Sequence, residues 1–311
     1  MTLPQLTSDR VFLTDGGLET TLVFRDGIDL ADFAAFPLLE TDSGRAALTA
    51  YYTSYIAIAE RLNLGMVLDT PTWRANLDWG ARLGYDALRL ADVNHRAVEF
   101  VRALAHEHPA VTSLLNGVVG PRGDGYIVGN TMSPSEAAAY HALQARSFAD
   151  AGAHMMSAIT MTYAEEAIGV SRAAHAVGLP VVISFTVETD GRLPSGQSIG
   201  DAITEVDQAT DAGPAYYMIN CAHPTHFVAA LDAGEAWTQR ISGLRANASR
   251  LSHAELDAAT ELDRGDIAEL AAMYVDLGSR IDLRVVGGCC GTDDEHVATI
   301  AGAFVTGAVV R

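Results

Sequence analysis

The feature that most restricts the fold of this chain is the alternation of short apolar, β-branched segments with alanine-rich amphipathic segments. The candidate strands are residues 11–14, 66–69, 112–119, 154–159, 181–186, 216–220, 240–244 and 283–286. The helix-like segments between them include residues 45–62, 92–106, 134–151, 164–177 and 266–277. Strands that alternate with helices form parallel sheets with crossover helices. Eight strands in 311 residues therefore predict an α/β fold, a single (β/α)8 TIM barrel. The alternative is a doubly wound open sheet, but no Gly-x-Gly-x-x-Gly turn supports it.

Composition indicates one domain over residues 1–311, because 49% of the residues are hydrophobic and can build one large core. No window approaches the roughly 18–20 apolar residues of a membrane span. The first ten residues lack the basic start and apolar run of a secretory signal, and three cysteines make no disulfide framework, so we expect a cytoplasmic protein.

The net charge of −19 argues against nucleic acid and anionic membranes as partners. The sequence carries no signal for an oligomeric state.

Two adjacent cysteines, Cys289 and Cys290, and one distant cysteine, Cys221, are the candidate metal ligands. Neighbouring cysteines pair poorly, because a disulfide prefers a Cα separation of about 5.5–6 Å and adjacent Cα atoms lie about 3.8 Å apart. Three thiolates suit a tetrahedral zinc ion whose fourth position stays open, as in catalytic zinc sites. Two alternatives are cysteines that act as small buried hydrophobes and a structural zinc with His223 or His226 as fourth ligand.

The barrel prediction brings scattered polar residues to one rim, because active sites of TIM barrels lie at the carboxyl ends of the strands. The residues expected there are Asp15, Asp69, Thr70, Gly120, Pro121, Cys221, Cys289 and Cys290. Three long connections, at about residues 18–44, 187–197 and 245–265, follow strands on the same rim. Long loops in compact domains are often functional, so we expect these segments to cover a substrate.

Five segments resemble the homocysteine S-methyltransferase family, the zinc-dependent thiol methyltransferases. They are Gly287–Thr292 (Gly-Gly-Cys-Cys-Gly-Thr), the pair Asn220-Cys221, Thr14–Thr20 with its Asp-Gly-Gly turn, Asp69–Asn76, and Gly117–Pro121. The resemblance extends from about residue 10 to residue 305. It implies the same barrel fold and a Zn²⁺ ion on the three cysteines.

Thiolate-rich zinc suits thiol chemistry, because zinc deprotonates a coordinated thiol and three cysteine ligands leave the bound sulfur electron-rich. The resemblance implies a methyltransferase that moves a methyl group from a sulfonium-type donor, S-methylmethionine or S-adenosylmethionine, to a thiol. Homocysteine, giving methionine, is the preferred acceptor. The expected partners are therefore a small-molecule thiol and an onium methyl donor, and no organic cofactor is required.

The family places its Asp-Gly-Gly segment against the substrate amino acid, so Asp15, Gly16 and Gly17 are predicted substrate-binding residues. The glycines also fit a turn that ends a strand. Thr70 and Asn247 are further candidates. Asn247 resembles the family's Pro-Asn-Ala-Gly turn, although its flanking residues differ.

One position departs from the family pattern. Relatives carry a Glu-Thr pair after the fourth strand, whose glutamate binds the amino group of homocysteine, and here the pair is Ile159-Thr160. Either Glu188 or Glu19 replaces that acid, or the acceptor is a thiol that is not an amino acid. A non-catalytic zinc- or thiol-binding barrel and a redox protein that cycles its vicinal cysteines are the alternatives from other functional classes.

Overall fold

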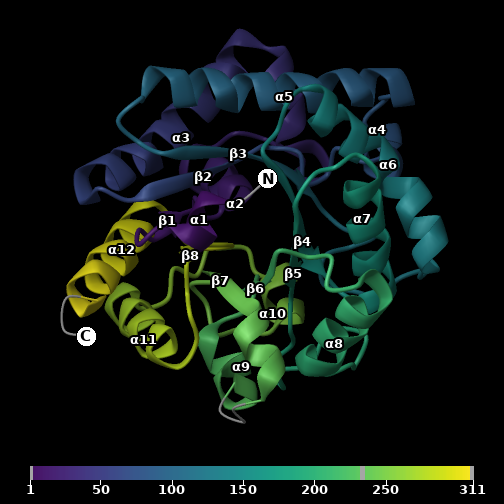
Figure 1. The fold of residues 1–311 in the computed structure, drawn as a ribbon. Helices are drawn as coiled ribbons and strands as arrows, with labels where there is room; N and C mark the ends of the chain where they lie inside the picture. The colour runs from purple at the N-terminus through teal and green to yellow at the C-terminus, as the bar shows by residue number, and fades with distance from the viewer. Residues whose placement is uncertain (1–2, 232–234, 309–311) are drawn as a thin grey trace.

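Eight parallel strands form a closed barrel in the computed structural model, which describes residues 3–231 and 235–308 (Figure 1). Each strand pairs with the next along the chain, and β8 pairs with β1, so the barrel prediction is confirmed. The strands are β1 (Phe12–Leu13), β2 (Gly65–Asp69), β3 (Ser113–Val119), β4 (Met155–Met161), β5 (Val181–Phe185), β6 (Tyr216–Asn220), β7 (Ile241–Ala246) and β8 (Val285–Gly288).

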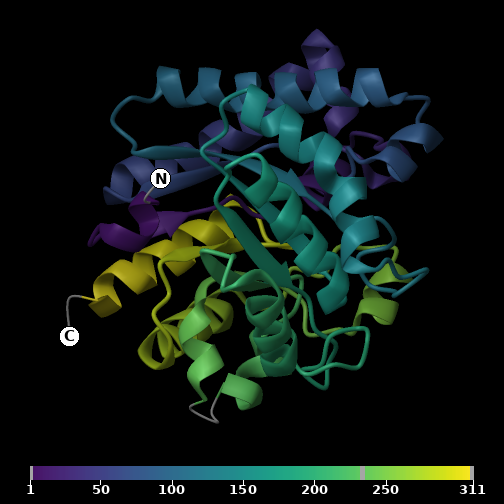
Figure 2. The same ribbon diagram turned by 45° about the vertical axis from the view of Figure 1, so that its right-hand side comes forward.

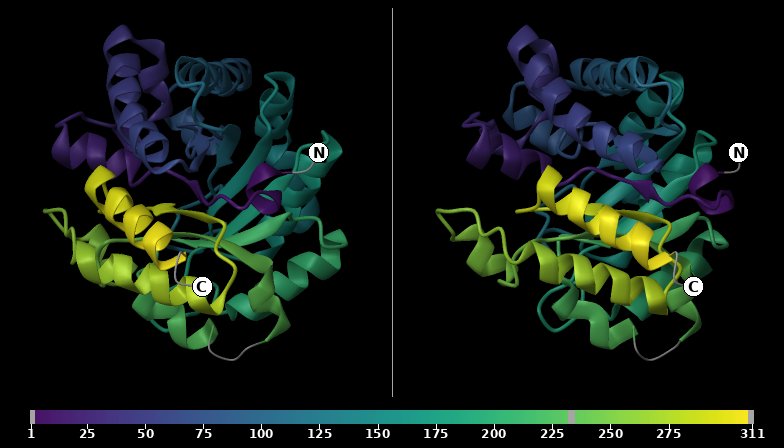
Figure 3. Two further views of the ribbon diagram at one scale, coloured as in Figure 1. Left: turned by 60° about the vertical axis from the view of Figure 1, so that its left-hand side comes forward. Right: turned by 90° about the vertical axis from the view of Figure 1, so that its left-hand side faces the viewer.

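Helices surround the barrel, and all of the described ones except α1 follow a strand. They are α1 (Pro4–Thr7), α2 (Leu18–Thr20), α3 (Asp42–Leu62), α4 (Leu77–Arg82), α5 (Ala87–Glu107), α6 (Pro134–Asp150), α7 (Ala164–Ala176), α8 (Ile199–Thr210), α9 (Pro224–Leu231), α10 (His253–Asp257), α11 (Ile267–Arg280) and α12 (Asp294–Ala308). Helices α5, α6 and α7 lie side by side on one flank (Figure 2). Helix α12 packs against both α11 and α3, which closes the ring where the chain ends meet (Figure 3).

Burial explains why the strands read as apolar runs in the sequence. Every residue of β2 and of β4 to β8 is buried, since one face of each strand meets the helices and the other fills the barrel. Helix α1 closes the amino-terminal end of the barrel: Leu3 joins the inner core, and Gln5 donates a hydrogen bond to the Tyr216 hydroxyl at 3.3 Å. The carboxyl ends of the strands are left for the site.

The expected long connections contain helical turns. Residues 18–44 include α2 and short turns at Thr21–Arg25, Ala31–Phe33 and Phe36–Glu40, and residues 245–265 include α10.

Within residues 3–231 and 235–308, no helix has both the length and the apolar character needed to cross a bilayer.

Candidate metal centre and active site

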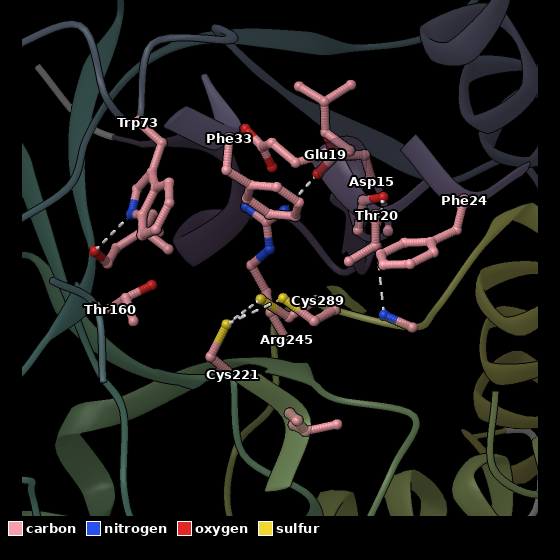
Figure 4. A pocket seen from close by; sticks show the side chains of 18 of the residues that line it. Asp15, Glu19, Thr20, Phe24, Phe33, Trp73, Thr160, Cys221, Arg245 and Cys289 are labelled. Atoms are coloured by element: carbon pink, nitrogen blue, oxygen red, sulfur yellow. Dashed lines mark hydrogen bonds and ion pairs between the residues drawn. The ribbon is translucent and has the colours of Figure 1, made fainter. Parts of the chain in front are cut away.

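Three cysteines from two strand ends form one cluster at the carboxyl rim. Cys221 directly follows β6, and Cys289 and Cys290 directly follow β8. Their sulfur atoms lie within 4.8 Å of one another, with 3.8 Å between Cys221 and Cys290 and 2.6 Å between Cys221 and Cys289 (Figure 4). Cys221 has a φ of +52°, a left-handed conformation that is uncommon for a residue with a side chain and typical of functional turns.

The side chain of Asn220, the residue before Cys221, holds neighbouring strand ends together through hydrogen bonds. Its side-chain oxygen accepts hydrogen bonds from the Thr160 backbone N–H at 2.9 Å and from the Ser184 hydroxyl at 2.6 Å, and its amide donates to the Thr160 hydroxyl at 2.9 Å. Thr160 interrupts the ladder of β4 and has a φ of +65°. Asn220 therefore ties the ends of three adjacent strands together directly beneath the cluster.

A tyrosine and a histidine support the cluster from the side. The Tyr126 hydroxyl lies 3.5 Å from the Cys290 sulfur and 3.9 Å from the Cys221 sulfur. The Tyr126 ring stacks on the imidazole of His253, with 4.0 Å between ring centroids. His253 in turn lies 2.7 Å from the Cys221 carbonyl oxygen and 3.0 Å from the Glu188 carboxylate. Neither Tyr126 nor His253 was singled out from the sequence, because only the fold brings them to the cysteines.

The cluster fits a thiophilic metal such as zinc. Among the described residues, it is the one group of three or more cysteine, histidine or acidic side chains close enough to share an ion. Zinc–sulfur bonds of about 2.3 Å place the sulfurs of a tetrahedral site about 3.8 Å apart, which the Cys221–Cys290 pair matches. The Cys221–Cys289 pair is closer, so metal binding would separate those sulfurs. Hydrogen bonds from Cys221 and Cys290, helped by the positive charge of Arg245, hold the pKa of Cys289 well below its ordinary value.

A cavity of about 400 Å³ opens above the cysteines. The predicted site residues that line it are Asp15, Gly16, Gly17, Glu19, Thr70, Cys221, Cys289 and Cys290. Seven acidic and two basic residues line the cavity, so its field favours cationic ligands. The structure thus brings most of the predicted site together at one end of the barrel.

Arg245, the fifth residue of β7, forms the charged floor of the cavity, and the sequence analysis missed it. Its guanidinium pairs with the carboxylates of Asp15 and Asp69, and its Nε donates to the Gly288 carbonyl at 3.2 Å. Asp15 also accepts a hydrogen bond from the Tyr51 hydroxyl at 3.2 Å. Burial raises the pKa of Asp15, and Arg245 opposes that rise. An arginine at the rim end of an apolar strand was the available signal, because a buried guanidinium needs carboxylate partners.

The glycines of the first turn allow two loops to touch. A Cβ atom on Gly17 would lie 2.6 Å from the Cys289 carbonyl oxygen, and one on Gly16 would lie 2.8 Å from the Thr292 carbonyl oxygen. The turn after β1 can therefore lie directly against the turn that carries the cysteine pair. Thr70 is fixed differently: its hydroxyl accepts the Val118 backbone N–H at 2.9 Å and lies 2.6 Å from the Thr72 hydroxyl.

Glu19, in α2, differs from the other deep acids of the cavity. It is half-buried, and no side-chain hydrogen bond or ion pair to its carboxylate exists within residues 3–231 and 235–308. Burial, together with the negative charge of Cys289, raises the pKa of Glu19 to about 7, although a hydrogen bond from its own backbone N–H and the positive charges of Arg74 and Arg245 oppose the rise.

Glu188 and Asn247 lie outside the residues that line the cavity. Glu188 binds His253, as described above, and is one layer removed from the cysteines. Asn247 is buried, and its side-chain oxygen has no hydrogen-bond partner among the described residues.

Aromatic side chains line the upper cavity. They belong to Phe24, Phe33, Trp73 and Tyr126 (Figure 4 labels the first three). The Arg74 guanidinium lies 4.8 Å from the Trp73 ring and 3.8 Å from the ring of Trp79, which does not line the cavity, so Arg74 links the cavity wall to Trp79.

Comparison with known proteins gives a family and a fold. The family model described as homocysteine S-methyltransferase matches residues 12–304. Two crystal structures of the homocysteine methyltransferase MmuM from Escherichia coli, in oxidized and metallated forms, superpose with TM-scores of 0.75 and 0.73. Each is 22% identical in sequence, and each alignment covers 95% of this chain and 96% of the other. No curated protein matches the sequence significantly.

Proposed function

Because the chain belongs to the homocysteine S-methyltransferase family and is a methyltransferase, we propose that it transfers a methyl group from a sulfonium donor to a thiol bound by zinc at Cys221, Cys289 and Cys290. The observation that carries this proposal is the cluster of three thiols, with no histidine or carboxylate in the set, at the base of a cavity. A histidine-rich zinc site would favour water activation, whereas three thiolates favour a thiol nucleophile.

Different residues around the cavity would activate the thiol, support the cysteine cluster and position the acceptor. Zinc, when bound, would lower the pKa of a ligated substrate thiol and so supply the nucleophile. The Tyr126 hydroxyl, 3.5 Å from the Cys290 sulfur, can donate a hydrogen bond to a thiolate and keeps an apolar ring between the cluster and His253. The turn of Gly16 and Gly17 holds the β8 loop in place, and the segment from Asp15 to Glu19, together with Thr70, faces the far end of the acceptor.

A sulfonium donor can transfer its methyl group in a single in-line displacement, because its leaving group is a neutral thioether. The excess of acidic residues around the cavity attracts such a cation. The aromatic rings that line the cavity can also form cation–π contacts with a methyl-onium group, and each such contact stabilises the complex by about 0.5–2 kcal/mol. S-methylmethionine and S-adenosylmethionine are therefore the proposed donors, and homocysteine, giving methionine, is the proposed acceptor.

Mass spectrometry tests the reaction directly. L-homocysteine with a ¹³C-labelled carbon chain is incubated with zinc-loaded protein and with either donor, whose sulfonium methyl groups are trideuterated. The proposal expects methionine that carries both the ¹³C chain and one CD₃ group, at a rate that depends on protein concentration. With S-methylmethionine the demethylated donor is a second methionine, which carries CD₃ without ¹³C. ¹³C-labelled homocysteine that acquires no CD₃ after complete incubation with both donors would overturn the proposal.

A further inference from the structure

The end of β4 carries no acid that could bind an ammonium group. Ile159 lines the cavity there, at the position where the resembled family has its amino-binding glutamate. An ammonium group that leaves water for a cavity needs a charged acceptor within hydrogen-bonding distance. If the acceptor thiol carries an amino group, another carboxylate must face it.

Asp15 and Asp69 are already engaged. Arg245 pairs with one carboxylate oxygen of each, Tyr51 donates to the second oxygen of Asp15 at 3.2 Å, and Asn116 donates to the second oxygen of Asp69 at 2.6 Å. Each oxygen of both carboxylates therefore has a partner inside the barrel. Removing Asp15 from this set for a ligand would leave the buried Arg245 short of a counter-ion, which is costly.

Glu188, the second acid considered from the sequence, is also engaged. Its carboxylate lies 3.0 Å from Nδ1 of His253, and Glu188 does not line the cavity. Its position behind the Cys221 backbone suits the support of the metal loop rather than contact with a substrate.

Glu19 faces the cavity and is not engaged by another side chain among the described residues. The remaining four acids that line the cavity are exposed to solvent: Asp124, Asp257, Glu261 and Asp263. Glu19 lines the cavity that the cysteines share, and Figure 4 shows it on the far side of that cavity from Cys221. Within the described residues its carboxylate has no side-chain partner, although it is half-buried. The negative charge of Cys289 and the positive charge of Arg74 both influence it, so it lies within electrostatic reach of the cluster and of the cavity's second cation.

We infer that Glu19 is the specificity-determining residue that pairs with the ammonium group of the acceptor, so the acceptor is a thiol that carries an amino group. This inference rests on the proposed thiol methyl transfer. It assigns to α2 the role that the end of β4 has lost, and it leaves Asp15 as a positioning residue that holds Arg245.

Three thiols that differ in one group each test the inference. L-homocysteine carries both ammonium and carboxylate, 4-mercaptobutyrate lacks the ammonium group, and 3-mercaptopropylamine lacks the carboxylate. Dissociation constants are measured by calorimetry on zinc-loaded wild-type protein and on Glu19→Gln, Glu188→Gln and Glu165→Gln. Glu165 is an exposed acid on α7 and serves as the charge-matched control.

The wild type should bind L-homocysteine about tenfold or more tightly than 4-mercaptobutyrate, which corresponds to one charge-assisted hydrogen bond. In Glu19→Gln that ratio should approach one, 3-mercaptopropylamine should weaken by a similar factor, and 4-mercaptobutyrate should bind unchanged. Glu188→Gln and Glu165→Gln should keep the wild-type ratio. Glu19 has no side-chain partner to lose among the described residues, so the isosteric variant should fold normally.

The remaining outcomes overturn the inference in distinguishable ways. A wild type that binds all three thiols equally would refute amino recognition and leave thiol methyl transfer standing. A ratio that survives in Glu19→Gln, or that collapses in Glu188→Gln, would assign recognition elsewhere. A zinc-loaded wild type that binds no thiol would overturn the proposed function and this inference together.

Discussion

Cys290 is the residue whose replacement separates metal binding from folding. It is partly exposed at the cavity, and its sulfur lies 3.5 Å from the Tyr126 hydroxyl, 3.8 Å from the Cys221 sulfur and within hydrogen-bonding reach of Cys289, so the smaller hydroxyl of Cys290→Ser fits the same space. A hard oxygen is a poorer zinc ligand than a thiolate. We expect zinc affinity and methyl transfer to fall by more than about tenfold, since even the loss of a ligand's outer partner costs about 10- to 100-fold.

Metal analysis and turnover on the same preparation check this expectation. Chelator-treated wild type is the control for metal-free stability, and the variant should unfold at the same temperature as that control. A variant that retains one zinc per chain and normal turnover would contradict the assignment of Cys290 as a ligand.

Glu19 should make stability depend on pH. Its pKa is about 7 in the folded protein against an ordinary value of 4.5, so between these values the folded state binds the proton that the unfolded state releases. Stability from this group is therefore full below about pH 4.5 and is lost as pH rises through 7. Each pKa unit corresponds to about 1.4 kcal/mol.

Urea unfolding of metal-free wild type and Glu19→Gln at pH 5 and pH 8 measures this effect. The variant cannot ionise, so its free energy of unfolding relative to wild type should increase by about 2–3 kcal/mol between the two pH values. An offset that is the same at pH 5 and pH 8 would show that Glu19 titrates normally in the folded state.

At the scale of elements, the loop after β3 depends on one buried acid of α7. Glu166 accepts the Arg122 backbone N–H at 2.7 Å and lies 2.9 Å from Nε2 of the buried His141. That loop continues to Tyr126, which faces the cysteines. Glu166 therefore couples the α6–α7 layer to the position of Tyr126.

Glu166→Ala should lower the free energy of unfolding by about 3 kcal/mol, because it leaves the buried imidazole of His141 without a partner and removes the hydrogen bond to the Arg122 backbone N–H. Glu165→Ala, one residue away and exposed, should change it by less than about 1 kcal/mol. Denaturant titrations of the two variants give the comparison. Equal losses in both would mean that Glu166 does not anchor the loop.

Strand positions were largely predictable from apolar runs, and β6 matches the expected residues 216–220. Strands β7 and β8 each extend two residues past the expected ends, to Ala246 and Gly288. Arginine and glycine do not read as strand residues, but Arg245 pairs with Gly287 and Ala246 with Gly288 in the closed barrel. Helix α5 begins at Ala87, five residues before its expected start, because Asp86 caps it.

The site residues that belong to short local motifs could be predicted from the sequence. Those whose role depends on contacts between distant strands could not. The cysteine motifs and the Asp-Gly-Gly turn are local, and the cavity brings them together. The engagement of Asp15 by Arg245 joins residues 230 positions apart. The arginine at the end of β7 indicates that carboxylate partners are needed, but no local pattern identifies Asp15 as one of them. The same contact decides which acid remains free for a ligand.

At the scale of the whole molecule, the net charge of −19 should make stability rise with moderate salt. Like charges repel one another in the compact state, and about 0.15 M salt screens exposed charges beyond about 8 Å. The Arg245 ion pairs are buried and should be screened little. We expect a higher Tm in 300 mM than in 10 mM NaCl by differential scanning calorimetry. An unchanged or lower Tm would mean that exposed ion pairs outweigh the repulsion.

The central claim is that the three cysteines hold a metal which takes up the acceptor as a thiolate. Calorimetric titration of zinc-loaded protein with L-homocysteine, in two buffers of different ionisation enthalpy, tests it most directly, because ligation of a thiol to zinc releases its proton. We predict saturable binding with about one proton released per chain, and no such release after chelation or in Cys290→Ser. Binding without proton release would contradict thiolate ligation and with it the proposed mechanism.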